Sequence, residues 1–386
     1  MFRLATLAAA PLLLALLALP PPAHASKFRT LYHFTDNTNG GDPLGGVVQD
    51  ASGTIYGETY AGGSYICPNP PYTKQGCGVV YALSPTGALN LLVSFTGANG
   101  GHGNITPVLI GNTLYGATAA GGANNDGVIF SVNTDGTNFS ILHQFSGTDG
   151  TEPNALVADA SGTLYGITKT GGTNHVGVLF SLTQSGTYTV LHNFALPVSG
   201  YPNALIIAAN GTLAGSTFGG GKVSDACYAG CGTVYTYTPA NQRFTTLGTY
   251  PSSGNQGYTP YVGSFGPGPT IYASNFDLSI FSLNRQAGYT TLALQNQYTL
   301  GAGANSGPAY AKNGVLYGVL EGGILTGAGV IYSVQNNTLQ DIHAFSGGRG
   351  GSLPAAKPTI TASGTLIGTT EGGQCDECGT IWELSP

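Results

Sequence analysis

One repeated stretch constrains the fold of this chain more than any other feature of its sequence. GTLYGITKTGGTNHVGVLFSL, residues 162–182, closely matches NTLYGATAAGGANNDGVIFSV, residues 112–132. Related copies recur along the chain, and the Tyr of the LYG motif, or its replacement, marks each copy: Tyr56, Tyr115, Tyr165, Ala214, Tyr272, Tyr317 and Ile367. A period of about 50 residues indicates one supersecondary unit that is stacked many times.

Each repeat contains four short apolar or alternating runs. In the third copy these runs cover residues 155–159, 163–168, 177–183 and 188–194, and Gly, Ser and Gln turn signals separate them. Such runs are typical of short antiparallel strands. No stretch has convincing helical periodicity. Seven units of four strands predict an all-β fold, a seven-bladed β-propeller of four-stranded antiparallel blades.

The two ends of the chain complement each other. The last unit stops after its third strand, in TIWELSP, and the missing fourth strand has its counterpart in FRTLYHF, residues 28–34. We therefore expect the N-terminal strand to complete the last blade and to close the ring without an exposed strand edge. An open solenoid is less favoured, because linear arrays usually end in atypical capping units.

Residues 1–25 have the pattern of a secretory signal peptide. Arg3 precedes an apolar run, Pro11 interrupts that run, and Ala23-His24-Ala25 provides a small-residue cleavage site. The run is also short for a bilayer span. We expect the mature chain, residues 26–386, to be a single propeller domain. It is expected to be a secreted or periplasmic monomer with no membrane span or C-terminal anchor.

The repeat motif resembles a known family. LYGxTxxGG, followed by GV[LI][FY]SL and LxxF, resembles the Gloeo/Verruco (GloVer) tandem repeat of exported bacterial proteins. The motif is clear in the second and third units. Ala214 replaces the Tyr in the fourth unit, and YASNFDLS in the fifth lacks the Gly-Gly turn. The resemblance implies an exported repeat protein with no assigned chemistry and no catalytic residues to carry over.

The composition limits the kinds of partner. Only 7% of the residues are charged and the net charge is −6, which argues against a nucleic-acid partner because phosphate neutralisation requires clustered Lys and Arg. The polarity comes instead from Thr, Ser, Asn and 22 Tyr residues. Such a surface suits neutral hydrogen-bonding partners.

The few charged residues are expected to gather on one face of the ring. The loops from strand two to strand three and the connections between blades open on the same face, here called the upper face. Most acidic residues map to it: Asp36, Asp42, Glu58, Asp126, Asp149, Glu152, Asp225, Asp277, Glu321, Glu371, Asp376 and Glu377, with Lys74, Lys169, Lys222 and Arg349. The alternative explanation is that longer loops simply hold more polar residues.

Two sets of candidate site residues follow from this distribution. We expect Asp149, Glu152, Lys169, His175 and Arg349 to contact a ligand. Sugar hydrolysis requires two carboxylates that face each other across the bond, so the catalytic candidates are Glu58, Glu152, Glu321 and Glu371. Three of these follow the second strand in blades 1, 6 and 7, which adjoin in a closed ring.

Other catalytic motifs and cofactor sites are not indicated. There is no GxSxG elbow, and GGRGG at Gly347 is not followed by a helix that would make it a phosphate loop. DASG at Asp50 and Asp159 offers too few oxygens for Ca²⁺ and is explained by an Asx turn. We expect no metal and no cofactor.

The six cysteines form three local pairs. These pairs are Cys67 with Cys77, Cys227 with Cys231, and Cys375 with Cys378. An even number of cysteines in an exported chain predicts disulfides. The alternative for CDEC is a redox dithiol or half of a zinc site, but neither a following helix nor a second CxxC supports it.

The histidines fall into two groups. His143, His192 and His343 occupy one repeat position, which predicts packing or a fixed hydrogen bond, because a single active site would not need three copies. His102 and His175 lie in upper-face loops without repeat equivalents. Either could act as a base, although a solvated loop histidine is the simpler interpretation.

The leading interpretation is a non-enzymatic propeller that binds a polysaccharide or another cell-surface component through the upper face. A polysaccharide hydrolase or lyase that uses carboxylates of that face is the alternative, and a protein-interaction platform is a third. The short upper loop of the fifth unit adjoins the long loop of the fourth, and this step could form one wall of a groove.

Overall fold

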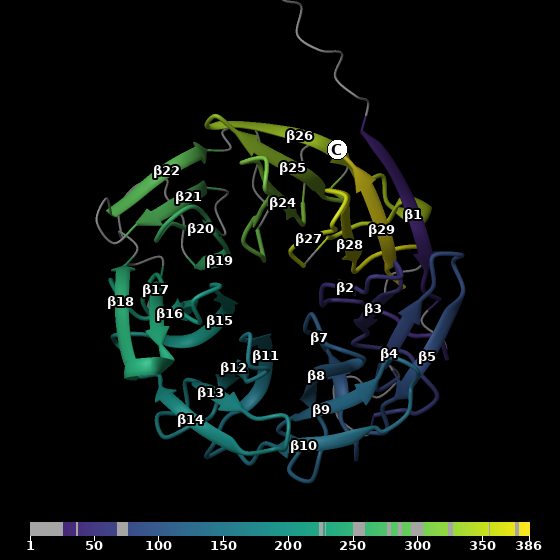
Figure 1. Ribbon diagram of the computed structural model, residues 1–386, viewed down its shortest axis with the longest axis horizontal. Coiled ribbons are helices and arrows are strands. Elements are labelled where there is room, and N and C mark those ends of the chain that lie inside the picture. The colour runs from purple at the N-terminus through teal and green to yellow at the C-terminus, as the bar shows by residue number, and fades with distance from the viewer. Residues whose placement is uncertain are drawn as a thin grey trace, which may run out of the picture.

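Seven antiparallel sheets surround a central axis like the blades of a propeller (Figure 1). The computed structural model describes residues 26–35, 38–67, 76–223, 227, 229–249, 259–275, 279–284, 288–294, 304–322, 327–354, 356–374 and 378–386. The expected all-β seven-bladed propeller is confirmed, whereas the expected signal peptide, residues 1–25, lies outside this part of the chain.

The first four blades follow the chain in order. Blade 1 consists of β2 (Val48–Gln49), β3 (Ile55–Glu58), β4 (Val79–Leu83) and β5 (Leu89–Ser94). Blade 2 consists of β6 (Gly101–Gly103) and β7 (Val108–Ile110), which share the innermost place, β8 (Thr113–Ala120), β9 (Val128–Asn133) and β10 (Ser140–Gln144). Blade 3 consists of β11 (Thr151–Ala158), β12 (Leu164–Thr170), β13 (Val178–Leu182) and β14 (Tyr188–Asn193). Blade 4 consists of β15 (Gly200–Ile207), β16 (Leu213–Gly219), β17 (Thr233–Thr238) and β18 (Arg243–Thr249).

The remaining blades complete the ring. Blade 5 consists of β19 (Pro260–Phe265), β20 (Ile271–Asn275), β21 (Ser279–Asn284) and β22 (Gly288–Leu294). Blade 6 consists of β23 (Ala309–Tyr310), β24 (Leu316–Leu320), β25 (Val330–Gln335) and β26 (Thr338–Ala344). Blade 7 consists of β27 (Thr359–Ile360), β28 (Leu366–Thr370) and β29 (Thr380–Ser385), with β1 (Lys27–His33). The helical turns of the described chain are η1 (Pro239–Asn241) and η2 (Gly348–Gly350), and no helix there could span a membrane.

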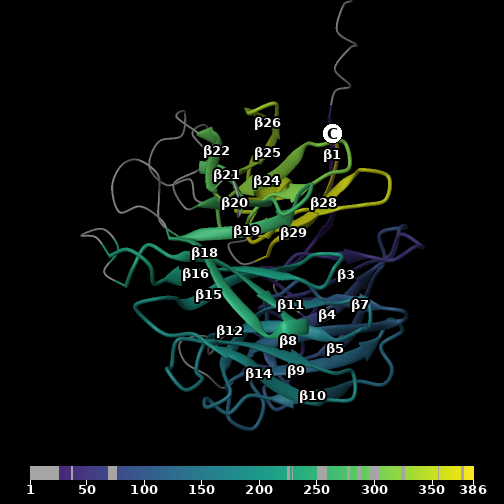
Figure 2. The ribbon, with the colours of Figure 1, turned by 60° about the vertical axis from the view of Figure 1, so that its left-hand side comes forward.

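The N-terminal strand closes the ring as expected. β1 pairs antiparallel with β29, with Phe28 opposite Leu384 and Thr30 opposite Trp382. β1 and the C-terminal strand therefore lie side by side on the outer rim (Figures 1 and 2). The last blade gains its outer strand from the opposite end of the chain, which leaves no open seam.

The Gly of the LYG motif makes room for an aromatic ring. A Cβ atom on Gly166 would collide with the ring of Phe180, which lies on the third strand of the same blade. The same relationship recurs in these pairs: Gly57–Tyr81, Gly116–Phe130, Gly215–Tyr235, Gly318–Tyr332 and Gly368–Trp382. All these rings are buried, so the motif places a large side chain in the core of each of these blades.

The Thr of the motif joins two strands through its hydroxyl group. Thr168 Oγ1 donates to the carbonyl of Thr170 at 2.9 Å and accepts the backbone N–H of Val178 at 3.1 Å. Thr59 and Thr217 make the same two contacts in blades 1 and 4. This buried pair of hydrogen bonds fixes the exit of the second strand toward the upper face.

The repeated histidines have the packing role that their position predicts. The imidazole ring of His192 stacks on Phe244 of the next blade at 3.8 Å between centroids, and His343 stacks on Phe28 at 3.7 Å. His143 stacks on Tyr188 in the same way. These contacts bridge neighbouring blades at the outer rim.

The Asx-turn explanation of DASG is also confirmed. Asp159 Oδ1 accepts the backbone N–H groups of Ser161 and Thr163, and Tyr165 donates to Oδ2. Asp50 has the corresponding partners.

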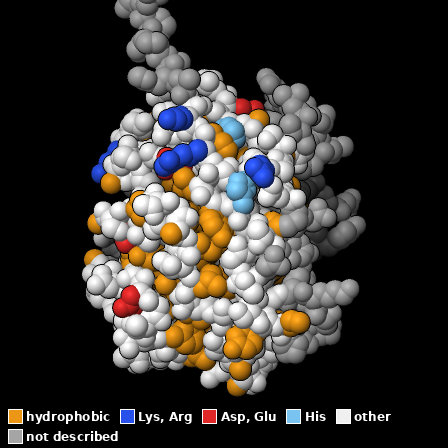
Figure 3. Space-filling model, turned by 90° about the vertical axis from the view of Figure 1, so that its right-hand side faces the viewer, with side chains coloured by type: hydrophobic (Ala, Val, Ile, Leu, Met, Phe, Trp, Pro, Cys, Tyr) orange, Lys and Arg blue, Asp and Glu red, His pale blue; other side chains and the backbone are white. Residues whose placement is uncertain are grey.

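Charged side chains are sparse on the side of the molecule that Figure 3 shows, where uncharged polar and apolar surface predominates.

Candidate functional site

Three aromatic side chains and two asparagines form a groove on the upper face, at the mouth of the central channel. Tyr201, Phe218 and Tyr261 line it with Asn154, Asn203, Lys169 and Pro202, and its volume is about 400 Å³. These residues come from blades 3, 4 and 5. The upper face is therefore hollowed beside blade 4. The expected step between the loops of the fourth and fifth units stays a prediction, because residues 276–278 lie outside the described residues.

Phe218 stands at a repeat position whose side chain varies. The equivalent residues, five positions after the first residue of LYG, are Tyr60, Ala119, Lys169, Glu321 and Glu371. Phe218 follows the Thr that fixes the end of the second strand, and its side chain is 55% exposed. This position is Lys, Glu or Ala in four other blades and Tyr in blade 1, and the exposed ring of Phe218 gives the groove an apolar wall.

Tyr201 belongs to a second repeat position that rings the channel mouth. It begins the innermost strand of blade 4 with a positive φ of 57°. The equivalent residues of other blades share this left-handed backbone: Asp42, His102, Glu152, Thr259 and Leu353. Such a conformation costs a non-glycine residue about 1 kcal/mol or more, yet none of these six positions is Gly. These six blades thus have different side chains at the same left-handed position.

The asparagines join neighbouring blades and face the groove. Asn154 Nδ2 donates to the carbonyl of Pro202 at 2.9 Å, and Asn203 Nδ2 donates to the carbonyl of Pro260 at 3.0 Å. The carboxamide of Asn203 also accepts the Ser216 hydroxyl at 2.8 Å. The positions of the groove walls are therefore fixed by hydrogen bonds between blades 3, 4 and 5.

An ion pair and further acids border the groove. Lys169 Nζ lies 3.2 Å from Glu152 Oε2, and both side chains are about half exposed. Burial raises the pKa of Asp126, and the negative charges of Asp149 and Glu152 raise it further. Lys169 therefore lines the groove with Glu152 as its ion-pair partner, whereas the expected contact of Asp149, Glu152 and Lys169 with a ligand stays a prediction.

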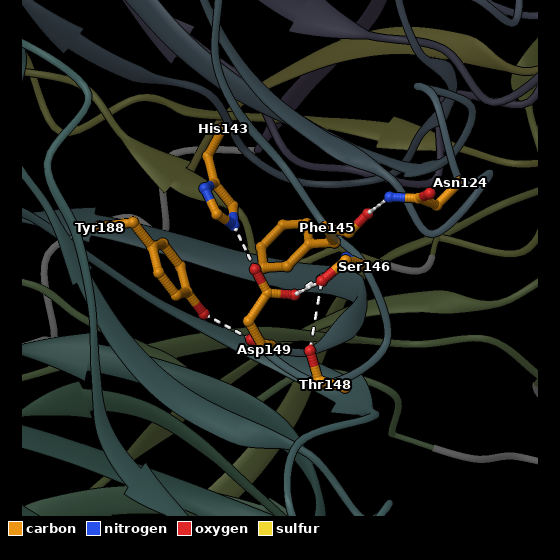
Figure 4. A network of polar contacts seen from close by, with 7 residues as sticks. All are labelled: Asn124, His143, Phe145, Ser146, Thr148, Asp149 and Tyr188. Atoms are coloured by element: carbon orange, nitrogen blue, oxygen red, sulfur yellow. Dashed lines mark hydrogen bonds and ion pairs between the residues drawn. The ribbon is translucent and has the colours of Figure 1, made fainter.

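Asp149 is held by a structural network (Figure 4). Its Oδ2 lies 2.9 Å from His143 Nε2, and its Oδ1 accepts the backbone N–H of Ser146 at 2.9 Å. Tyr188 donates to the Asp149 carbonyl at 2.6 Å. Because both carboxylate oxygens are engaged, Asp149 supports the connection from blade 2 to blade 3 rather than facing the groove.

Glu321 and Glu371 lie on the opposite side of the channel mouth. Burial raises the pKa of Glu321, a hydrogen bond from Asn305 lowers it, and the charge of Glu371 raises it. Burial also raises the pKa of Glu371. Tyr261 links this pair to the groove, since burial and then the Glu321 carboxylate raise the pKa of its phenol.

Glu58 is separated from the other two glutamates by its position in the repeat. It stands two positions earlier, at the place of Ala117 and Thr369, and it is fully buried between blades 1 and 2. Its carboxyl group lies against Gly103 and Gly116. Burial raises its pKa well above the ordinary value, and the nearby N–H groups of Ala117 and Ile105 lower it only in part.

The remaining candidates lie away from the groove. Arg349 is exposed in η2, where its carbonyl accepts the Thr30 hydroxyl at 3.3 Å. His175 is exposed in the loop between β12 and β13, and it does not line the groove. His102 is buried, with Nδ1 2.9 Å from the carbonyl of Tyr60. Its pKa is lowered by burial, an effect that this contact partly offsets.

Disulfide bonds cross-link two upper-face loops. Cys67 is bonded to Cys77 and Cys227 to Cys231, as expected. Cys378 is also disulfide-bonded, whereas Cys375 lies outside the described residues.

Several charged residues that were expected on the upper face also lie outside the described residues: Asp36, Lys74, Asp225, Asp277, Asp376 and Glu377. Within the described chain, no cluster of His, Cys, Asp and Glu could hold a metal ion.

The sequence reasoning missed the aromatic groove. Tyr201, Phe218 and Tyr261 lie in three different parts of the chain, and no charge or spacing sets them apart. One signal was available: Phe218 departs from the Lys or Glu found at the equivalent place in three other copies, at Lys169, Glu321 and Glu371. The contributions of Tyr201 and Tyr261 depend on how blades 4 and 5 adjoin.

Comparisons with known proteins identify the repeat and the fold. A family model described as the Gloeobacter/Verrucomicrobia repeat matches residues 71–278, more than half of the chain. No curated protein matches the chain.

Solved structures similar to this chain include two lyases and an extracellular domain of a two-component system. Streptogramin B lyase is 12% identical, with 93% of this chain and 97% of that chain covered at a TM-score of 0.61. Virginiamycin B lyase from Staphylococcus aureus is 12% identical, with coverages of 92% and 99% and a TM-score of 0.59. The extracellular domain of a hybrid two-component system from B. thetaiotaomicron is 14% identical, with coverages of 90% and 39% and a TM-score of 0.55. At these identities the similarity shows the fold alone.

Proposed function

We propose that this chain, which belongs to the Gloeobacter/Verrucomicrobia repeat family, is an exported glycan-binding propeller that holds sugar rings in its upper-face groove. The observation that carries the proposal is the aromatic lining of the groove by Tyr201, Phe218 and Tyr261. Ligand sites combine apolar and aromatic walls with a few oriented polar groups. The C–H face of a pyranose ring fits such walls.

The polar groups of the groove match the hydroxyl groups of a sugar. Asn154 and Asn203 present carboxamides that are already oriented by bonds to the next blade. Lys169 and Glu152 offer a donor and an acceptor at the rim. Since the groove is preorganised by these bonds, a sugar would bind with little cost for ordering the protein.

Export agrees with two independent features. The leader-like residues 1–25 predict secretion, and the disulfides Cys67–Cys77 and Cys227–Cys231 are typical of an oxidising compartment. A glycan of the cell surface or surroundings would be accessible to the protein there.

The experiment uses mature protein, residues 26–386, and a panel of soluble polysaccharides in affinity electrophoresis. We expect retention by at least one polymer, and Phe218→Ala should weaken it at least tenfold, which corresponds to about 1.4 kcal/mol. Val223→Ala is the matched control, because Val223 is 59% exposed on the same loop but does not line the groove. Equal retention of wild type and Phe218→Ala would refute the groove as the binding site.

Polysaccharide cleavage is the second candidate function. The carboxyl pKa values of Glu321 and Glu371, both raised chiefly by burial, favour it, because acid catalysis uses a carboxyl group that stays protonated near neutral pH. Mass spectrometry of the same mixtures would detect released fragments. Loss of fragments in both Glu321→Gln and Glu371→Gln would establish cleavage, whereas intact polymers with wild type would exclude it for the panel.

A further inference from the structure

A cavity of about 450 Å³ occupies the central channel below the groove. All seven blades contribute to its wall, through residues such as Gly45, Ile105, Leu156, Leu205 and Val262. The lining is mostly aliphatic side chains, backbone and uncharged polar groups. No Asp or Glu occurs among the described residues that line it. The size suits one small organic molecule.

Lys357 is the one basic side chain among the described residues that line this cavity, and the phenol of Tyr261 is the other ionisable group there. Lys357 precedes β27 in blade 7 and reaches across the ring, where Nζ donates to the carbonyl of Gly263 in blade 5 at 2.8 Å. The side chain keeps contact with channel solvent. Desolvation by the nearby protein atoms lowers its pKa, although the residue as a whole is exposed.

The charge of Lys357 has no anionic partner in the described chain. The ion pairs found there involve Arg29, His143 and Lys169, not Lys357. An ammonium group has three N–H donors, and the carbonyl of Gly263 uses one of them. Because Lys357 is exposed to the channel solvent, its remaining donors are open to an anionic ligand in the channel.

Three unpaired polar atoms on the same wall define the rest of the ligand. The Oδ1 atoms of Asn104 and Asn154 and the Oγ atom of Ser306 are buried without a hydrogen-bond partner. All three residues line the cavity. The carboxamide oxygens accept hydrogen bonds, and the serine hydroxyl can donate or accept. Hydroxyl groups on a ligand would satisfy them once these side chains turn toward the cavity.

We propose that the central channel binds a small polyhydroxylated carboxylate, such as a sugar acid, with its carboxylate on Lys357. Lys357 also lines a cavity at the other end of the channel, together with residues such as Asn210 and Phe265, and its described lining has no acid. The ligand therefore enters from the lower end.

This site is distinct from the proposed glycan groove, although both share the wall formed by Asn154, Asn203 and Tyr261. Phe218 lines only the groove, and Lys357 lines only the channel. Substitutions at these two residues consequently separate the two sites. Failure of one proposal leaves the other testable.

Isothermal titration calorimetry of mature protein with D-glucuronate tests the proposal, with D-glucose as the neutral counterpart. We expect saturable binding of one glucuronate per chain and at least tenfold weaker binding of glucose. Lys357→Gln keeps a donor but removes the charge, and it should weaken glucuronate binding at least tenfold. Lys312→Gln, which alters an exposed lysine outside the channel, should bind like wild type.

A pH series on wild type gives a readout that does not depend on how the variant folds. Only the protonated amine attracts a carboxylate, so affinity should fall as the pH rises through the lowered pKa of Lys357. The absence of saturable glucuronate binding by wild type would overturn the proposal. Unchanged affinity in a folded Lys357→Gln variant would also overturn it and leave Lys357 as a tether between blades 5 and 7.

Discussion

The imidazole ring of His143 lies parallel to the phenol ring of Tyr188, with 3.9 Å between centroids and 4° between planes. The two rings belong to neighbouring blades, and Asp149 contacts both residues (Figure 4). His192 and His343 stack on the next blade in the same way. The repeat thus places titratable rings at several seams between blades.

These seams make the fold sensitive to acid. Burial lowers the pKa of His192 below its ordinary value, so the folded protein binds fewer protons than the unfolded chain near that value. Stability from this group is fully present above about pH 6.5 and is lost as the pH falls toward its lowered pKa. His192→Phe keeps a ring against Phe244 without a titrating group.

The measurement for this prediction is urea unfolding of wild type and His192→Phe at several pH values. The stability of the variant relative to wild type should increase as the pH falls, by up to about 1.4 kcal/mol per pH unit. Taking the difference between the proteins removes the effect of buried carboxyl groups, which has the opposite sign. A difference that does not vary between about pH 7 and about pH 5 would contradict the assignment.

Glu58→Gln should stabilise the protein at neutral pH. The pKa of this fully buried carboxyl group is raised in the folded state. Folding therefore takes up a proton at any pH between the pKa of Glu58 in the unfolded chain and its pKa in the folded protein. Stability is therefore lost as the pH rises above about 4.5, at up to about 1.4 kcal/mol per pH unit. Gln has nearly the same shape and does not titrate.

Thermal or urea unfolding near neutral pH and below about pH 4.5 checks this sign. The Glu58→Gln variant should be more stable than wild type at neutral pH, and the difference in stability should disappear in acid. Glu383→Gln is the control, since it removes an exposed pair with Arg29 and should change stability by less than about 1 kcal/mol. A less stable Glu58→Gln at neutral pH would mean that the buried carboxylate is charged and well solvated by the backbone.

Gly166→Ala should destabilise blade 3. Its added methyl group would collide with the buried ring of Phe180, and such overpacking costs about 1–3 kcal/mol. Gly248→Ala is the comparison, because its Cβ would lie 3.4 Å from Leu283 Cδ2, an ordinary contact. Equal unfolding free energies for the two variants would show that the ring of Phe180 does not require the glycine.

Replacing Glu152 separates backbone strain from side-chain function. Glu152 has a positive φ of 52°, which favours Gly over Ala by about 1 kcal/mol. Both substitutions remove the ion pair with Lys169, so Glu152→Gly should be more stable than Glu152→Ala by that amount in urea unfolding. Equal stability would show that the left-handed backbone at the channel mouth is not strained.

Much of the fold could be predicted because the repeat encodes it locally. The LYG and Thr positions describe contacts within one blade, such as Gly166 with Phe180 and Thr168 with Val178. The closing strand was also predictable, since β1 has the sequence of the strand that blade 7 lacks. Cysteine pairing followed from homologous loop positions at Cys77 and Cys231.

The candidate site was less predictable because it depends on contacts between blades. Glu58 precedes the position of Glu321 by two residues in the repeat, and this offset buries it against the next blade. The sequence did not single out Lys357, because the innermost strands of different blades pair in different registers. In blade 3, Val157 pairs with Tyr165 and stands five residues after the left-handed Glu152. In blade 7, Thr359 pairs with Ile367 and stands six residues after the left-handed Leu353.

A crystal structure of the mature protein with an oligosaccharide from a retained polymer tests the central claim most directly. We predict a pyranose ring packed on Phe218 between Tyr201 and Tyr261, with hydroxyl groups bonded to Asn154 or Asn203. A sugar bound on the lower face or the outer rim, with the groove left to solvent, would contradict the account.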